Sequence, residues 1–168
     1  MKPDIKTDNL IDSISMLGRQ LSSQSLWLAT AESCTGGGIG QALTSVSGCS
    51  RWYRGGVIAY CNQLKQGLLG LDASMLLQHG SVSQAVVEGM AVGVCQCCNA
   101  DLAVSISGTA GPNGGSVEKP VGLVWLAWAD QGRVTSRMYH FSGNRQAVRN
   151  AAILAAVSGL HELLFDRL

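Results

Sequence analysis

Apolar residues three and four positions apart predict a first helix over residues 8–24, the spacing of an amphipathic helix. Thr7 or Asp8 can cap it. The apolar positions are Leu10, Ile11, Ile14, Leu17 and Leu21.

Capping residues mark further helices. Asn62, Ser83 and Asn144 each stand before a segment with apolar residues at helical spacing, so we expect each to cap a helix. Gly70 and Gly80 are expected to end helices, because glycine adopts the left-handed backbone that often follows the last turn.

Short apolar runs between these helices predict β-strands over residues 26–30, 56–60, 102–107, 123–129 and 133–141. The last two flank Asp130, Gln131 and Gly132, which suit the turn of an antiparallel hairpin. Strands that alternate with helices, plus one hairpin, predict a three-layer α/β/α fold with a mostly parallel, mixed sheet. We expect residues 1–168 to form one domain.

Composition and charge exclude several classes of protein. The chain has 168 residues, of which 46% are hydrophobic and 14% charged, and a chain of this length buries about 70% of its unfolded surface. Lys and Arg total 12 against 11 Asp and Glu. This balance gives no electrostatic basis for binding nucleic acid or a membrane surface, so we expect neither partner.

The N-terminal residues lack the apolar stretch of a secretory signal, and a cytoplasmic location is therefore expected. The six cysteines are expected to be reduced thiols. Cys95, Cys97 and Cys98 form the only cysteine cluster and lack further zinc ligands at suitable spacing. We expect them to be buried in helix packing, with no metal bound.

Polar segments follow three of the predicted strands, at residues 32–38, 60–65 and 107–115. Ligands of open α/β sheets bind beyond the carboxyl ends of the strands. The chain has 21 glycines but only 3 prolines, and eight of the glycines lie at 36–40 and 108–115. Gly89, Gly93 and Gly159 fall inside predicted helices, where close packing is the one available explanation.

The first segment, residues 32–38, leads from a strand into a helix. Its glycines allow close approach to a ligand, and the start of the helix offers backbone N–H groups to an anion or oxyanion. Ser33 is placed to act as a nucleophile beside them. The simpler alternative is that Glu32, Ser33 and Thr35 only cap the helix.

Known glycine-loop motifs are absent from this segment. It has no GxxxxGK[ST], GxGxxG or GxSxG sequence. Triphosphatase activity, redox use of NAD and an α/β-hydrolase nucleophile elbow are therefore disfavoured.

The second segment contains Tyr60 and Lys65, and no other Lys or Arg occurs between Lys65 and Lys119. A serine nucleophile needs a base, and a desolvated lysine with a lowered pKa can serve. The alternatives are a tyrosine at the rim with a solvated hydroxyl and a lysine on a solvated helix face.

The third segment, residues 107–115, combines four glycines with the hydroxyls of Ser107 and Thr109. Such a loop can hold a phosphate or ribose through its backbone N–H groups, or be a purely structural loop. Arg145 and Arg149 lie four residues apart on one helix face; Arg145 can meet an anion, although such pairs are often surface charges.

Several motifs in order resemble the CinA C-terminal domain family. They are Glu32-Ser33-Cys34-Thr35-Gly36-Gly37; Tyr60-x-Asn62-x-x-Lys65; Ser107-Gly108-Thr109-Ala110-Gly111-Pro112; Lys119-Pro120-Val121-Gly122; and Phe141-x-Gly143-x-Arg145-x-x-x-Arg149. The resemblance covers residues 10–165. It implies the family's α/β fold and a homo-oligomer, with no metal or organic cofactor.

Stand-alone members of this family convert nicotinamide mononucleotide to nicotinate mononucleotide and ammonia. The resemblance therefore implies that Ser33 is the nucleophile, Lys65 the general base and Tyr60 a group that relays or stabilises the proton. The expected substrate-binding residues are Glu32, Thr35, Gly36, Gly37, Asn62, Ser107, Gly108, Thr109, Ala110, Gly111 and Arg145.

Three positions depart from the family pattern: Gly38, Cys61 and Ser107. They bear on substrate preference more than on reaction type. Two alternatives stay open: a non-catalytic nucleotide-binding module of the same fold, and an amidase acting on another carboxamide. Trp52, Tyr53, Trp125 and Trp128 are expected to mark a subunit interface if they are exposed.

Overall fold

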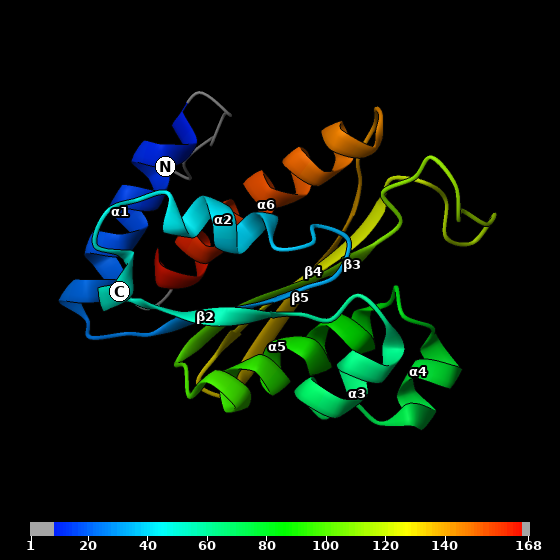
Figure 1. Ribbon diagram of the computed structural model, residues 1–168, viewed down its shortest axis with the longest axis horizontal. Coiled ribbons are helices and arrows are strands. Elements are labelled where there is room, and N and C mark those ends of the chain that lie inside the picture. Colours follow the sequence, from blue (N-terminus) through cyan, green and yellow to red (C-terminus); the bar gives the residue numbers. More distant parts are fainter. Residues whose placement is uncertain (1–8, 166–168) are drawn as a thin grey trace.

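The computed structural model describes residues 9–165, which form a five-stranded sheet with helices on both faces (Figure 1). Four of the five strands point the same way and β4 is opposed to them: β1 pairs in parallel with β2 and β3, whereas β3–β4 and β4–β5 are antiparallel. The three-layer fold with a mixed sheet is thereby confirmed. In sheet order the strands are β2 (Tyr53–Ile58), β1 (Leu28–Glu32), β3 (Leu102–Gly108), β4 (Leu123–Asp130) and β5 (Arg133–His140).

The helices divide between the two faces. One face is covered by α1 (Leu10–Ser23), α2 (Gly38–Thr44) and α6 (Arg145–Phe165), and the other by α3 (Asn62–Leu69), α4 (Ala73–His79) and α5 (Gln84–Cys98) (Figure 1). A short 3₁₀ turn, η2, spans Cys49–Arg51. By length and composition α6 alone, among the described residues, is apolar enough to cross a bilayer, but its buried residues pack in the core.

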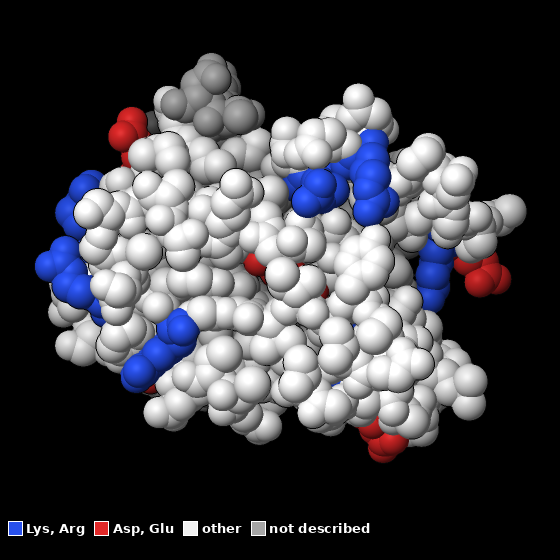
Figure 2. All heavy atoms as spheres, viewed as in Figure 1, with Lys and Arg blue, Asp and Glu red and all other residues white. Residues whose placement is uncertain are grey.

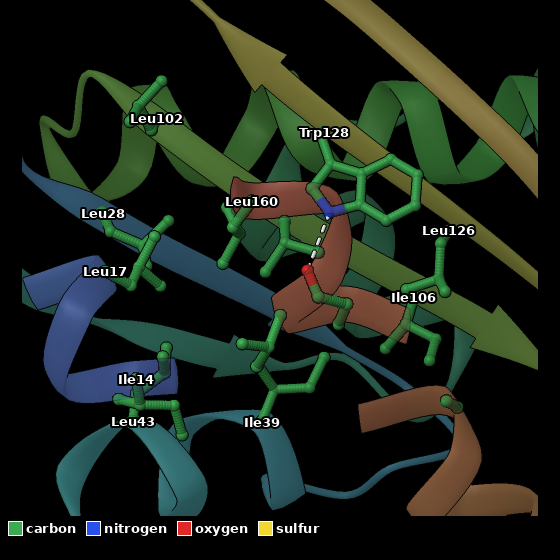
Figure 3. Close-up of a cluster of buried hydrophobic side chains, with 14 of the residues drawn as sticks. Ile14, Leu17, Leu28, Ile39, Leu43, Leu102, Ile106, Leu126, Trp128 and Leu160 are labelled. Carbon is green, nitrogen blue, oxygen red and sulfur yellow. Dashed lines mark hydrogen bonds between the residues drawn. The ribbon is translucent and has the colours of Figure 1, made fainter. Parts of the chain in front are cut away.

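Each face has its own hydrophobic core. The core under α1, α2 and α6 includes Ile14, Leu17, Ile39, Leu43 and Trp128 (Figure 3). The Trp128 indole N–H donates to the carbonyl of Ala156 on α6, at 3.0 Å. These contacts bury almost the whole tryptophan side chain and tie α6 to β4.

Two of the three helical glycines lie where close packing excludes a side chain. A Cβ on Gly159 would stand 2.6 Å from Nε1 of Trp128 and closer still to two ring carbons. A Cβ on Gly93 would collide with the backbone carbonyl of Leu69. A Cβ on Gly89 would lie 3.4 Å from its nearest neighbour, an ordinary contact distance, so close packing does not account for this third glycine.

Most predicted helix ends agree with the structure. The hydroxyl of Ser83 accepts from Val86 N, and the carbonyl oxygen of the Asn144 side chain accepts from Ala147 N. Gly70 and Gly80 follow α3 and α4 with positive φ. Thr7 and Asp8 lie outside the described residues, and Asn9 stands at the N-cap of α1.

The predicted cap at Asn62 is wrong. Cys61 holds the N-cap position of α3, with no side-chain hydrogen bond, and Asn62 is the first helical residue. β2 also ends at Ile58 rather than at Tyr60, and β1 continues to Glu32. The extension of β1 follows from pairing on both sides, because Glu32 is in register with Ile58 and Ile106.

The cysteines and the large aromatic residues differ in how deeply they are buried. All six cysteines are free thiols, but Cys97 is exposed and its neighbours Cys95 and Cys98 only half-buried, so the prediction that this cluster is buried is wrong for Cys97. Trp52 and Trp128 are buried in the core, and neither marks an interface.

Candidate active site

The three polar segments meet at one edge of the sheet. β2, β1 and β3 are adjacent and parallel, so their carboxyl ends lie side by side. The segments enclose a pocket of about 260 Å³ with a largely polar lining. Its lining residues are Ser33, Cys34, Tyr60, Lys65, Ser81, Val82, Ser107, Gly108, Thr109, Ala110, Gly111, Asn113, Gly114 and Arg145.

A serine and a lysine face each other in this pocket. Ser33 follows β1, where its backbone N–H donates to the carbonyl of Ile106 at 3.1 Å. Lys65 comes from α3, and its Nζ lies 3.4 Å from Ser33 Oγ. Both side chains are buried, at 8% and 1% exposure. The separation is slightly long for a hydrogen bond, as is common for catalytic pairs without substrate.

Burial favours the neutral form of the Lys65 amine. Loss of hydration disfavours the charged ammonium and lowers the lysine pKa below its ordinary value. The carbonyl of Ala59 accepts from Nζ at 2.9 Å. In the neutral amine, one N–H can stay on Ala59 while the lone pair points to Ser33. This geometry fits a lysine that takes the proton of the serine hydroxyl.

The turn after Ser33 is organised by Glu32. This carboxylate is 2% exposed and accepts from the hydroxyl of Thr35 and from the N–H groups of Gly37, Ile39 and Gly40, at 2.7–3.0 Å. Glu32 and Thr35 therefore bond within the turn and do not line the pocket. The side-chain carboxylate caps α2, which is the simpler reading of these residues.

Backbone N–H groups are available beside the serine. Among the described residues, neither the N–H of Cys34 nor that of Thr35 donates to a backbone carbonyl. They lie where the chain turns from Ser33 toward α2. Burial raises the pKa of the Cys34 thiol to about 11, so this neighbour stays protonated and is a poor nucleophile at neutral pH.

Tyr60 and Arg145 form the outer wall of the pocket. Nη2 of Arg145 donates to the Tyr60 hydroxyl at 3.1 Å, and Nη1 donates to the carbonyl of Gly111 at 2.8 Å. Tyr60 is 59% exposed and has no hydrogen bond to Ser33 or Lys65 in the structure. It is thus paired with the arginine rather than with the serine–lysine pair.

Arg149 lies one helical turn further along α6 and is not a free surface charge. Its Nη2 donates to the carbonyl of Thr35 at 2.8 Å. Figure 2 shows basic side chains close together over the N-terminal end of α6, whereas most other charged groups on this face lie toward its edges. Positive charge therefore gathers beside the pocket.

The third segment contributes the opposite wall. The Ser107 hydroxyl donates to the carbonyl of Ser81 at 2.7 Å. Ser81 and Val82, which precede α5, also line the pocket. Thr109 has its backbone tied to Leu123 and Gly122, and its hydroxyl has no hydrogen bond within the described residues. It is free to meet a ligand.

The structure thus brings together most of the predicted site residues. The pocket is shared by Ser33, Tyr60, Lys65, Arg145 and residues 107–111. The side chains or backbone of Glu32, Thr35, Gly36, Gly37 and Asn62 do not line it.

Five lining residues were not among the predicted site residues: Cys34, Ser81, Val82, Asn113 and Gly114. Cys34, Asn113 and Gly114 lie inside the polar segments and were within reach of sequence reasoning. Ser81 and Val82 lie outside these segments, and nothing in the sequence around them indicates a binding site. No group of three possible metal ligands occurs in residues 9–165.

Fold and pocket together define an α/β protein with a buried serine–lysine pair at the carboxyl ends of parallel strands. The sequence profile described as the CinA C-terminal domain matches residues 12–164. The chain belongs to this family.

Similar proteins agree with this assignment. The chain is 48% identical to the nicotinamide-nucleotide amidohydrolase PncC of Pseudomonas putida and 47% identical to that of Enterobacter agglomerans, in each case over 88% of this chain and 92% of the relative. A crystal structure of a CinA superfamily protein from Klebsiella pneumoniae matches with a TM-score of 0.90 at 35% identity, over 94% of this chain and 99% of the other.

Proposed function

We propose that the protein is a nicotinamide-nucleotide amidohydrolase that converts nicotinamide mononucleotide and water to nicotinate mononucleotide and ammonia. The observation that carries the proposal is the buried contact of Lys65 with Ser33 in the pocket. The PncC names of relatives that match most of the chain supply the substrate.

In the proposed reaction, Lys65 takes the hydroxyl proton of Ser33 as the serine oxygen bonds to the carboxamide carbon. The C–N bond then breaks, and the protonated lysine gives its proton to the leaving nitrogen, which departs as ammonia. Water then attacks the acyl-serine ester while Lys65 accepts a proton from it. Lys65 gives this proton to the departing serine oxygen, which restores the hydroxyl and releases nicotinate mononucleotide. No metal or organic cofactor enters this scheme.

The negative charge that develops on the carboxamide oxygen needs hydrogen-bond donors. We assign this role to the backbone N–H groups of Cys34 and Thr35, because they adjoin Ser33 and do not donate to a backbone carbonyl. A single such donor is typically worth about 10²–10³ in rate. The Thr109 hydroxyl, the backbone of residues 108–111 and the guanidinium of Arg145 are assigned to the ribose and phosphate. Tyr60, paired with Arg145, fits contact with substrate better than proton relay.

Ammonia release from nicotinamide mononucleotide tests this function. Wild type should release ammonia, and Ser33→Ala and Lys65→Ala should fall to background. Ser22→Ala, an exposed serine on α1, is the matched control and should keep full activity. Undiminished turnover in Ser33→Ala excludes the nucleophile assignment.

The same assay separates the two alternatives. A non-catalytic module binds the nucleotide in calorimetry without releasing ammonia at any pH. An amidase of other specificity releases ammonia from other members of a carboxamide panel but not from nicotinamide mononucleotide.

Location and assembly extend the proposal. A free nucleotide substrate and reduced cysteines fit a cytoplasmic enzyme. We also propose a homo-oligomer, supported by the exposed apolar side chains of Ile58 on β2 and of Leu64 and Leu68 on α3. A single monomeric species in sedimentation contradicts this assembly.

A further inference from the structure

We propose that Glu32 and Arg149 are positioning residues that fix the peptide groups after Ser33 in the orientation an oxyanion site requires. Neither side chain lines the pocket. Each would act through the backbone of the turn. The inference rests on the amidase function proposed above.

Arg149 reaches the serine through two peptide groups. Its guanidinium holds the Thr35 carbonyl at 2.8 Å, together with the N–H of Gly38 at 3.2 Å. The same peptide group carries the N–H of Gly36, which donates to the Ser33 carbonyl at 3.0 Å. That carbonyl belongs to the peptide group whose N–H is that of Cys34. Because the C=O and N–H of a trans peptide point in opposite directions, the contact at Arg149 helps to set where the Cys34 N–H points.

Glu32 holds the same turn from the strand side. Its backbone is fixed within β1, where its carbonyl accepts from Ala59 N at 2.8 Å. Its carboxylate accepts three N–H groups and one hydroxyl, all from residues 35–40. Without this acceptor, the N–H groups of Gly37, Ile39 and Gly40 would lose their partner in a buried or part-buried setting, which is unfavourable. The turn would then relax to satisfy them elsewhere.

The turn has little rigidity of its own. Gly36 and Gly37 have φ of 59° and 94°, and neither has a side chain to restrict its backbone. The conformation is therefore imposed by contacts from outside the two glycines. Glu32 and Arg149 supply them from opposite sides, β1 and α6.

Glu32→Gln is the first test. The substitution keeps the shape of the side chain but puts an NH₂ group where a carboxylate oxygen accepted hydrogen bonds, so at least one of the four contacts is lost. A displaced oxyanion donor typically costs about 10²-fold in rate. We expect kcat for ammonia release to fall by about this factor, with KM and the calorimetric affinity for nicotinate mononucleotide unchanged. Glu88→Gln, on α5 and outside the pocket, is the matched control and should retain wild-type kcat.

Arg149→Met is the second variant, and it carries the test if Glu32→Gln does not fold. A positioning role predicts a lower kcat at unchanged KM and an unchanged pH profile, since Lys65 is not altered. If Arg149 instead binds the substrate phosphate, KM rises and product affinity falls.

The outcomes separate the two proposals. No ammonia from wild type overturns the proposed function. Wild-type activity with unchanged kcat in Glu32→Gln and Arg149→Met overturns the positioning role. Loss of product binding in parallel with kcat also overturns it, because that pattern indicates a collapsed pocket rather than a displaced donor.

Discussion

Gly159→Ala tests the packing of α6 against Trp128. Alanine favours a helix by about 1 kcal/mol over glycine. The new methyl group, however, would stand 2.6 Å from the indole Nε1 and closer to two ring carbons, where real Cβ atoms are not found. The ring is 2% exposed and held by its bond to Ala156, so it cannot turn aside into solvent.

The magnitude follows from these opposing terms. Overpacking costs about 1–3 kcal/mol, and loss of the indole hydrogen bond leaves a buried N–H at a further cost of about 1–3 kcal/mol. Less the gain in helix propensity, Gly159→Ala should lower the free energy of unfolding by about 3 kcal/mol. For a chain of this length the melting temperature should fall by about 6–12 °C.

Gly67→Ala is the matched control. It lies on α3 with nothing within 4 Å of its added Cβ, and should stabilise the protein by about 0.5–1 kcal/mol. Urea unfolding followed by far-ultraviolet circular dichroism measures both variants. A Gly159→Ala protein as stable as wild type would refute the packing argument.

Further predictions concern the buried lysine and the helix caps. Because burial lowers the pKa of Lys65, kcat should rise with pH, and the midpoint of this rise should lie below the ordinary lysine value of 10.5. A pH profile of kcat that is unchanged in Lys65→Arg would contradict the assignment of Lys65 as the general base. The same shift means that the charged amine is disfavoured in the fold. Stability should therefore rise with pH between the lowered folded pKa and 10.5. Lys65→Met should melt at a higher temperature than wild type at neutral pH and should release no ammonia. Ser83→Ala should lose about 1 kcal/mol of unfolding free energy with its cap, whereas Asn62→Ala, which removes no cap, should stay within about 0.5 kcal/mol of wild type; equal losses in urea unfolding would contradict the assigned caps.

Local chemistry explains why much of the fold was predictable. Caps at Ser83 and Asn144 and the hairpin turn at Gly132 depend on a few neighbouring residues, and all three agree with the structure. The meeting of Ser33 and Lys65 was also within reach, because parallel neighbouring strands bring their carboxyl ends to one edge.

What the sequence could not supply depends on contacts between distant segments. Whether the carboxylate of Glu32 faces a ligand or the N–H groups of the next helix depends on how far β1 continues, which its two neighbouring strands decide. Ser81 lines the pocket, where its carbonyl accepts a hydrogen bond from the hydroxyl of Ser107, 26 residues away in the chain. Gly67, Gly89, Gly93 and Gly159 look alike in sequence, yet their surroundings range from open space to a tryptophan ring.

The long helix α6 connects the site to the core. Its first two turns place Arg145 in the wall of the pocket and Arg149 against the turn after Ser33, and its remaining turns fill the core against Trp128. Residues that pack the core and residues that contact the site and its turn therefore lie on one continuous helix. A substitution deep in the core that shifts this helix would pull both guanidinium groups out of place, and would be recorded as a defect in turnover although it lies far from the serine.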